Sequence, residues 1–335
     1  MNNYILSLKE KYQNNLTILA HHYQKQEIVD LADKVGDSLE LAQKIPELKT
    51  KYLIFAGVHF MAETAVILAQ KHQKVFLPVP NASCVMANTA PYKKVKKILE
   101  LLNEEKKVIP LAYVNSSASI KALCGEYGGS VCTSANAEKM LLWALEQADG
   151  VLFLPDKHLG LNTAQKINLP PSKITILNIK NKYSMQLDKN KTLFLWPGVC
   201  AVHFKYKVKH IEKARKSHPD AKVIVHPECS PQVVEQSDMA GSTSMLIKYV
   251  NSLPKKSKVY IGTEENLVQR LARKYKGQKE IFSLFPSFCS NMNKVNLKTL
   301  EYLLKNLKNL APVKVDEHIA KLSFKALSTM LKVCQ

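Results

Sequence analysis

The sequence predicts an α/β fold made of three homologous three-layer αβα domains with parallel sheets. Short apolar stretches with the length of buried strands alternate with helical stretches of about 10–15 residues, as in parallel sheets covered by helices on both faces. The same landmark residues recur three times at matched spacings. The chain has 335 residues, 46% of them hydrophobic, which is enough for three domains that each bury a core.

Composition excludes several other classes of protein. With 23% charged residues, 11 Gly and 15 Pro, the chain is neither disordered nor collagen-like nor fibrous. It has no apolar run of the ~18 residues that indicate a transmembrane helix. Its first ten residues lack the basic and apolar regions of a signal peptide. We therefore expect a cytoplasmic protein that contacts no membrane.

The net charge of +20 comes almost wholly from lysine, because only three of the 48 basic residues are Arg. Proteins that read nucleic-acid bases depend on Arg for bidentate hydrogen bonds, and no nucleic-acid-binding motif accompanies the charge. Lysines on predicted helix faces, as in Lys93–Lys97, are typical of solvated surface. A general attraction for anionic small molecules is the other interpretation, and nucleic-acid binding is disfavoured.

Each repeat begins with a predicted strand that ends in a triplet of mostly polar residues. The strands are Leu16–Ala20, Val108–Ala112 and Lys222–Val225, and their triplets are His21-His22-Tyr23, Tyr113-Val114-Asn115 and His226-Pro227-Glu228. Helical stretches come next, predicted over Glu27–Val35, Ala118–Leu123 and Pro231–Met239. Each of them leads to a motif that carries hydroxyl groups, and these motifs are Gly36-Asp37-Ser38, Cys132-Thr133-Ser134 and Gly241-Ser242-Thr243.

The second half of each repeat ends at a cysteine. A further strand, predicted at Tyr52–Ala56, Val151–Leu154 and Val259–Ile261, leads into a helix and then into an apolar segment. These segments end at Cys84, Cys200 and Cys289. A repeat of this kind, found three times, indicates an internally triplicated chain.

Spacing supports the triplication. From the start of the triplet to the hydroxyl residue is 17 positions in the first and third repeats and 21 in the second. From the triplet to the cysteine is 63 positions in the first and third repeats and 87 in the second. We expect four of the extra residues in a loop at Gly125–Gly129. The other 20 fall in Leu161–Lys191, which is rich in Lys, Asn and Pro.

These repeats predict three domains, which cover 1–86 together with 290–335, 87–200 and 201–289. The tail at 296–333 is predicted as two amphipathic helices that pack back on the first domain. Parallel α/β sheets bind ligands beyond the carboxyl ends of their strands, where all the triplets and repeat cysteines fall. Three domains about a pseudo-threefold axis would therefore bring these residues to one active site at the centre.

One cysteine per repeat suggests a metal centre. Three converging thiolates suit an iron–sulfur cluster in which one iron has no protein ligand, and zinc held by three Cys and one His is the alternative. An odd total of seven cysteines, without any C-x-x-C pair, argues against a disulfide framework, a zinc ribbon and a ferredoxin-type cluster. Cys229 is interpreted as a packing residue or as one that supports a neighbouring ligand residue, and Cys124, Cys132 and Cys334 have no counterpart in the other repeats.

The triplets and hydroxyl motifs carry acid–base and anion-binding groups. Tyr23, His203 and Glu228 are the candidate catalytic residues, because phenol, imidazole and carboxyl groups transfer protons, and Glu228 is the expected base. His203, close to Cys200, is also a candidate for ligand or substrate contact, and His59 and Glu63 are weaker candidates. The candidate substrate-binding residues come from the triplets and hydroxyl motifs and are His21, Ser38, Tyr113, Val114, Asn115, Ser134, His226, Pro227, Glu228 and Thr243.

These residues lie in segments that resemble the quinolinate synthase (NadA) family. The segments run from about residue 16 to 310 and include ILAHHYQ, GVHFMAET, LFLPDKHLG, LWPGVCAVH, HPECSPQVVEQSDMAGSTS and IGTEENLVQRL. The resemblance implies the triplicated fold with its central site. It also implies one [4Fe–4S] cluster per chain, held by Cys84, Cys200 and Cys289, with one iron open to substrate.

The resemblance also implies the reaction. The family is a transferase that condenses iminoaspartate with dihydroxyacetone phosphate to quinolinate, phosphate and water, on the de novo route to NAD. An aspartate oxidase, which would supply the unstable imine, is a candidate transient partner. The sequence departs from the family after each cysteine, where Val85, Ala201 and Ser290 replace the usual Pro and each restores a backbone N–H.

Three other functions stay open at this point. The first is a regulatory iron–sulfur sensor that has lost catalysis, although Tyr23, Glu228 and all three hydroxyl residues are present, which a sensor would not need. The second is a zinc-dependent lyase. The third is a basic RNA-binding protein, whose affinity for nucleic acid would depend strongly on salt.

Overall fold

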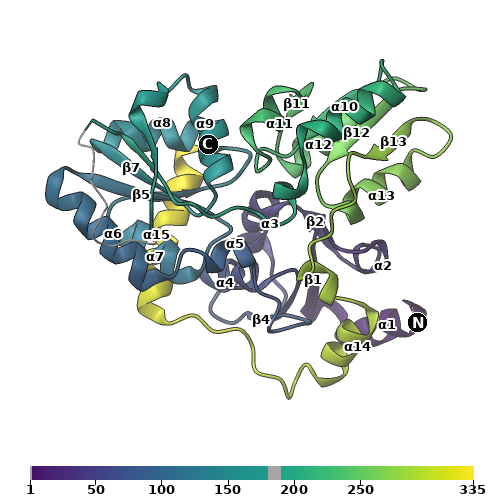
Figure 1. Ribbon diagram of the computed structural model, residues 1–335. Coiled ribbons are helices and arrows are strands. Elements are labelled where there is room, and N and C mark those ends of the chain that lie inside the picture. The colour runs from purple at the N-terminus through teal and green to yellow at the C-terminus, as the bar shows by residue number, and fades with distance from the viewer. Residues whose placement is uncertain (1, 180–189) are drawn as a thin grey trace. The chain divides into compact units, whose positions relative to one another are not determined.

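The computed structural model describes residues 2–179 and 190–335 (Figure 1). The chain forms two compact units. The first comprises Met1–Cys84, Lys209–Ile224 and Thr243–Val315, and the second comprises Val85–Val208, Val225–Ser242 and Asp316–Gln335. Every strand pair with a defined register is parallel, which confirms the α/β class. Among the described residues, no helix has the length and apolar character needed to cross a membrane.

The first sheet has the strand order β2-β1-β3-β4. Its strands, in chain order, are Leu16–His21 (β1), Lys34–Gly36 (β2), Tyr52–Ala56 (β3) and Lys74–Phe76 (β4). β1 is buried along its whole length, as expected for a central strand of a parallel sheet covered on both faces. Helices α1 (Asn2–Glu10) and α14 (Leu297–Asn306) pack beside this sheet, and Ile5 and Leu300 share its buried core with Ile18.

The helix predicted at Glu27–Val35 is shorter than expected. Only α2 (Gln26–Val29) is helical, and the chain then forms β2 at the edge of the sheet. Three residues are too few to show the alternation by which a strand is recognised in a sequence. α3 (Ser38–Lys44) follows at once and is capped by Asp37, and α4 (His59–Leu68) follows β3.

The third repeat has the same strand order. Its sheet is β11-β10-β12-β13, formed by Lys222–Val225 (β10), Met239–Ala240 (β11), Lys258–Gly262 (β12) and Glu280–Ser283 (β13). The helix predicted at Pro231–Met239 ends at Glu235 (α11, Pro231–Glu235), and its last residue, Met239, begins a short strand. The other helices are α10 (Val208–Ser217), α12 (Thr243–Ser252) and α13 (Glu265–Lys274).

The second unit holds a five-stranded sheet of order β6-β5-β7-β9-β8. Its strands are Val108–Tyr113 (β5), Ser130–Cys132 (β6), Gly150–Leu154 (β7), Ile174–Ile176 (β8) and Leu193–Leu195 (β9). β8 comes from the Leu161–Lys191 stretch that lengthens this repeat, of which residues 180–189 lie outside the described residues. The helices that precede or follow these strands are α6 (Tyr92–Glu105), α7 (Ala118–Glu126), α8 (Ala137–Gln147) and α9 (Lys157–Lys166). The loop predicted at Gly125–Gly129 is shorter, because α7 continues to Glu126.

The tail forms two helices, as predicted, but they pack in different places. α14 contacts α1 in the first unit. α15 (Glu317–Val333) instead packs on α7 and β6 of the second unit, beside α7 in Figure 1, and Ser323 Oγ donates to the Ala118 carbonyl at 2.8 Å. Gly125 permits this contact, because a Cβ there would lie 2.0 Å from the Leu322 carbonyl oxygen. The expectation that the whole tail packs on the first repeat was therefore wrong for α15, because periodicity defines an apolar face but not its partner.

Candidate functional site

The three triplets stand at the carboxyl ends of β1, β5 and β10, as predicted. In the first and third triplets, Nδ1 of the leading histidine accepts a hydrogen bond from the backbone N–H of the residue two positions later. The distance is 3.1 Å from His21 to Tyr23 and 3.3 Å from His226 to Glu228. Both histidines are buried, so each imidazole is fixed against its own turn.

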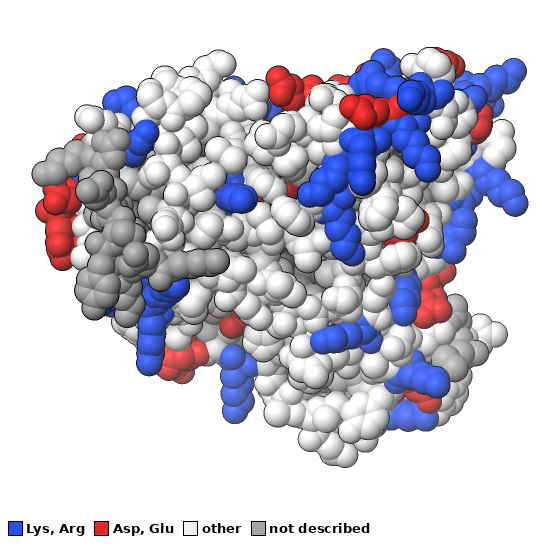
Figure 2. Space-filling model, viewed as in Figure 1, with Lys and Arg blue, Asp and Glu red and all other residues white. Residues whose placement is uncertain are grey.

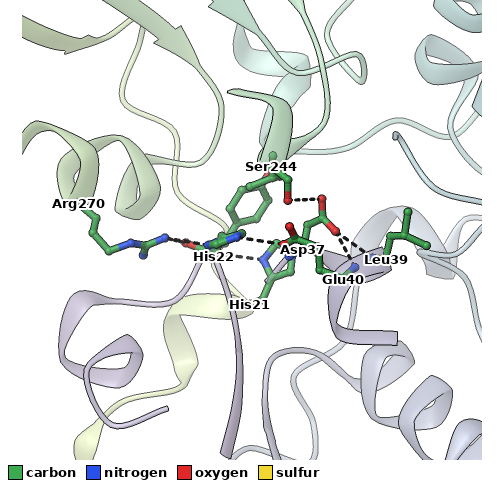
Figure 3. Close-up of polar contacts among 9 residues, drawn as sticks. His21, His22, Asp37, Leu39, Glu40, Ser244 and Arg270 are labelled. Atoms are coloured by element: carbon green, nitrogen blue, oxygen red, sulfur yellow. Dashed lines mark hydrogen bonds and ion pairs between the residues drawn. The ribbon is translucent and has the colours of Figure 1, made fainter. Parts of the chain in front are cut away.

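The hydroxyl motifs follow the short edge strands β2, β6 and β11 and so lie at the same end of each sheet. In the first two repeats, the middle residue of the triplet donates its N–H to the carbonyl two residues before the hydroxyl residue, at 3.1 and 2.7 Å. Ser38 and Thr243 begin α3 and α12, whereas Ser134 lies in the turn before α8. Ser244 Oγ donates to Asp37 Oδ2 at 2.8 Å, which ties the start of α12 to the cap of α3 (Figure 3).

Tyr23 contacts two hydroxyl groups within the first unit. Its Oη accepts a hydrogen bond from Thr243 Oγ1 at 3.1 Å and lies 2.9 Å from Thr263 Oγ1. This brings together a predicted catalytic residue and a predicted substrate-binding residue. The sequence did not indicate Thr263, which directly follows β12 and is fully buried. Its place after a central strand, at the end where ligands bind in parallel sheets, was the signal available.

The three repeat cysteines share one backbone arrangement. In each repeat, the first residue of the helix after the central strand donates its N–H to the carbonyl two residues before the cysteine. The pairs are His59 to Ala82 at 2.8 Å, Lys157 to Gly198 at 2.9 Å and Glu265 to Ser287 at 2.9 Å. A short helical turn follows each cysteine, at Val85–Asn88, His203–Lys205 and Met292–Lys294. The spacing match found in the sequence is therefore also a match of main-chain hydrogen bonds.

Exposure separates these cysteines from most of the others. Cys84, Cys200 and Cys289 are half-buried, and so is Cys334. The remaining three are buried, and burial raises the pKa of Cys124 to about 12 and the pKa values of Cys132 and Cys229 well above their ordinary value. Cys229 is thus a packing residue, as interpreted from its sequence position.

Two buried carboxyl groups hold the cysteine turns of the second and third repeats. Asp156 Oδ2 accepts the N–H of Cys200 at 2.9 Å, and its other oxygen caps α9. Glu264 does the same for Cys289 at 3.2 Å and caps α13. Burial raises the pKa of Glu264 to about 7, and burial together with the charge of Glu228 raises the pKa of Asp156 well above its ordinary value. The sequence did not indicate either residue. Each stands directly before a helix, where a carboxyl group is expected to act only as a helix cap.

The second unit contains a cluster of two histidines and a carboxylate. Glu228 Oε2 lies 3.0 Å from His203 Nδ1 and 3.1 Å from His226 Nδ1, and the two rings stack with centroids 4.3 Å apart. All three side chains are buried. The structure therefore joins His203, His226 and Glu228, which the sequence placed in two separate motifs.

Electrostatics in this cluster favour the ionised form of Glu228 and the uncharged form of His203. Burial and repulsion from His226 lower the pKa of His203 to about 4. Burial alone would raise the pKa of Glu228, but the two histidines outweigh it and hold that pKa below its usual range. Cys200 adds a thiol, and one ligand atom from each of Cys200, His203 and Glu228 lies within 4.8 Å of the others, an arrangement that could hold a metal ion.

The remaining predicted residues lie at or directly after the ends of strands. Tyr113 and Val114 are buried, whereas Asn115, Ser134 and Ser38 are half-buried. Pro227 is held through its carbonyl, which accepts from Asn162 Nδ2 at 2.7 Å. The weaker candidates His59 and Glu63 lie 3.8 Å apart on α4.

Comparison with known proteins assigns the family. Residues 3–332 match the family described as Quinolinate synthetase A protein. The chain is 43% identical to a quinolinate synthase of Bacillus cytotoxicus, over 98% of this chain and 92% of that protein. It is 42% identical to the quinolinate synthases of Geobacillus sp. and Bacillus anthracis, with the same coverage. A match that spans almost the whole chain and includes the triplets, the cysteine turns and the His203–Glu228 cluster shows that the chain belongs to the quinolinate synthetase A family.

Proposed function

We propose that this protein is a quinolinate synthase, an enzyme that condenses iminoaspartate with dihydroxyacetone phosphate to quinolinate, phosphate and water in NAD biosynthesis. Relatives bearing that name cover 98% of the chain, which carries the proposal. The reaction class is transferase. Its substrates are small anions, in keeping with a net charge of +20. An aspartate oxidase that supplies the imine is the proposed transient partner.

The proposed architecture has three αβα domains, 1–86 with the α14 part of the tail, 87–200 and 201–289, about a pseudo-threefold axis with the active site at the centre. The repeated strand order and the repeated hydrogen bond at each cysteine turn support it. α15 is left out of the first domain, because it packs on α7 and β6.

The proposed cofactor is one [4Fe–4S] cluster held by Cys84, Cys200 and Cys289. The donor set fits this group: thiolates are the ligands such clusters use, and these three half-buried cysteines stand on equivalent turns. A bound cluster of this kind supplies an iron with an open position, which polarises a hydroxyl or carbonyl oxygen as a Lewis acid. The N–H of Cys200 and that of Cys289, held by carboxyl groups, keep two of the turns in place.

Proton transfer is assigned to Glu228 and Tyr23. Glu228 stays anionic beside the imidazoles of His203 and His226, so its carboxylate accepts a proton from a carbon or nitrogen of the substrate. His203 positions that carboxylate and supports it through Nδ1. Tyr23 Oη, hydrogen-bonded to Thr243 and Thr263, donates a proton to an oxygen that leaves. These groups sit where strands end, which is where α/β sheets bind ligands.

Substrate binding is assigned to the residues that surround these groups. Their hydroxyl, amide and imidazole groups hold carboxylate and phosphate oxygens, and the middle residues of two triplets contribute only backbone. The set is His21, Ser38, Tyr113, Val114, Asn115, Ser134, His226, Pro227 and Thr243, with Glu228.

A zinc-dependent lyase is the second candidate, because Cys200, His203 and Glu228 offer a ligand set of the kind that zinc accepts. Such a site would need neither Cys84 nor Cys289. Metal analysis separates the two candidates, since one zinc per chain and a colourless protein belong only to the second.

The decisive experiment is the iron and sulfide content of protein purified without oxygen, combined with a quinolinate assay. We expect about four irons and four sulfides per chain, lost together with activity in Cys84→Ala, Cys200→Ala and Cys289→Ala. Cys334→Ala is the matched control, because Cys334 is half-buried but has no counterpart in the repeats, and it should keep both. A protein that stays colourless after anaerobic reconstitution would overturn the cluster assignment.

A further inference from the structure

An open cavity of about 520 Å³ lies in the first unit, beside His22 of the first triplet. Its cationic lining comes from Arg270, Arg273 and Lys274, beside the imidazole of His22, and apolar side chains from β2, α12 and α13 make up most of the rest. No residue of the proposed substrate or cluster set lines it. Figure 2 shows Lys and Arg gathered over the α10 and α13 region of this unit, so a local anion attraction adds to the lining.

The distribution of arginine singles out this cavity. Only three of the 48 basic residues in the chain are Arg, and two of them line it. Arg270 and Arg273 are three residues apart on α13, so they lie on the same face of the helix. A guanidinium presents a rigid fork of N–H groups that matches carboxylate and phosphate oxygens, which a lysine ammonium does not. In a chain that otherwise uses Lys, this pair indicates a place where the fork is needed.

Arg270, Arg273 and Lys274 have no acidic partner within ion-pair distance among the described residues. Arg270 Nη2 donates to the His22 carbonyl at 2.8 Å, and Nη1 donates to the Gln24 carbonyl at 3.2 Å. Both acceptors are neutral. Glu40 lies outside the lining, 3.5 Å from His22 Nε2, and Asp30 and Glu264 act on Arg270 only at longer range. Burial and the nearby Arg273 lower the pKa of Arg270 to about 10, so it stays charged near neutral pH. A partly buried cation without a carboxylate is stabilised by a bound anion.

We propose that this cavity binds a small phosphomonoester that carries an apolar or aromatic group. Arg273 and Lys274 meet the phosphate, with Arg270 at the inner end, and the apolar wall from Val35 and Ile247 meets the rest of the ligand. The phosphate is favoured over a carboxylate because three cations and His22 line the same cavity, and a phosphate dianion has the charge and the oxygens to use them.

Arg270 links this cavity to the first triplet. Its two hydrogen bonds hold the carbonyls of His22 and Gln24, on either side of Tyr23 (Figure 3 shows its contact with His22). An anion that draws the guanidinium outward therefore acts on the backbone that carries Tyr23. Occupancy of the cavity changes the KM for substrate more than kcat, and this second step alone rests on the proposed function.

The binding test uses phenyl phosphate as the probe and isothermal titration of the full chain, without substrates and therefore without turnover. We expect phenyl phosphate to bind at least about tenfold tighter than phenol, the same probe without phosphate. Arg273→Ala, whose side chain has no protein ligand to lose, should weaken binding about tenfold, whereas Arg215→Ala on α10, the third arginine, should not. Equal affinity of Arg273→Ala and wild type, or of phenol and phenyl phosphate, would overturn the proposal.

The coupling test is a quinolinate assay at increasing phenyl phosphate. We expect a KM that changes with the probe in wild type and in Arg215→Ala but not in Arg273→Ala. A wild-type KM that does not respond would overturn the coupling and leave the binding result intact. Arg270→Lys adds a structural readout, because it loses the fork that holds two carbonyls and should alter the tyrosine signal of Tyr23 in near-ultraviolet circular dichroism. If that variant does not fold, Arg273→Ala still decides the proposal.

Discussion

The cysteine turns of the first and third repeats have the same main-chain geometry but different side-chain support. In both, the first residue of the following helix donates its N–H to the carbonyl two residues before the cysteine. In the third repeat Glu264 also accepts the N–H of Cys289, and Asp156 does this for Cys200 in the second. The corresponding helix-cap residue in the first repeat is Val58, whose side chain has no acceptor atom. The three turns therefore share a backbone hydrogen bond, and a carboxyl group also holds the turns of Cys200 and Cys289.

The difference has an energetic meaning. A buried N–H that lacks an acceptor costs about 1–3 kcal/mol, and a helix cap contributes about 1 kcal/mol more. In its own repeat, each carboxyl group both accepts the cysteine N–H and caps the helix. The cost is the burial of an ionisable group. The Cys84 turn avoids that burial and leaves α4 without a side-chain cap.

Removing the strongest of these supports should have the largest effect. Asp156→Ala leaves the N–H groups of Cys200 and Leu159 without their acceptor; the first of these contacts is part-buried and the second is buried. We expect a loss of about 2–4 kcal/mol in the free energy of unfolding. Urea denaturation measures it, with Asp156→Asn as the control, because Asn keeps one acceptor oxygen and should lose about half as much. Equal stability of Asp156→Ala and wild type would show that the backbone alone holds the turn.

The second prediction concerns pH and Glu264, whose folded pKa is raised from 4.5 to about 7. Below pH 4.5 the carboxyl is protonated in both states, so it has no effect. Between pH 4.5 and about 7 it ionises more readily in the unfolded chain, so the folded state loses stability as pH rises. The loss reaches up to about 3 kcal/mol at 1.36 kcal/mol per pKa unit.

Glu264→Gln removes that slope, since Gln keeps an acceptor oxygen without a charge. The apoprotein of the Glu264→Gln variant should therefore become more stable, relative to wild-type apoprotein, as pH increases through this range. Glu280→Gln, an exposed carboxyl on β13, is the control and should run parallel to wild type. A difference between Glu264→Gln and wild type that stays constant from pH 5 to 8 would contradict the assigned burial of the carboxyl.

The smallest expected effect comes from adding a side-chain cap to the first repeat, which has none on α4. Val58→Thr places a hydroxyl at the cap of α4, where the backbone is extended as a cap requires. We expect a gain of about 0.5–1 kcal/mol over Val58→Ala, measured by thermal denaturation. The comparison with Ala removes the shared loss of apolar packing. Lower stability of the threonine variant would mean that this turn has no room for a side-chain acceptor.

The sequence predicted the central strands closely but not the short edge strands. β1, β3, β5 and β10 lie at or within one or two residues of the predicted positions, because buried strands in parallel sheets are continuous apolar runs. The helices predicted at Glu27–Val35 and Pro231–Met239 run into β2 and β11, since two or three residues carry no periodicity. Only pairing with a neighbouring strand makes such a segment a strand, and pairing is absent from local sequence.

The site was predicted in the same uneven way. The cysteines, the triplets and the hydroxyl residues were recognised because the repeats carry them at fixed distances. Thr263, Asp156 and Glu264 were missed, since each acts through a residue far away in the chain. The joining of His203 to Glu228 was missed for the same reason, as 25 positions separate them in the sequence.

By itself the sequence determined the α/β class, the threefold repeat and the identity of the three equivalent cysteines, because repetition and strand-length apolar runs are properties of the order of residues. The tertiary structure alone decided where α15 packs, which carboxyl group holds which cysteine turn, and that Glu228 lies between two imidazoles. The physical reason is that these outcomes depend on hydrogen bonds and packing between distant segments, and on burial, which shifts the pKa of each group only once the chain has closed around it.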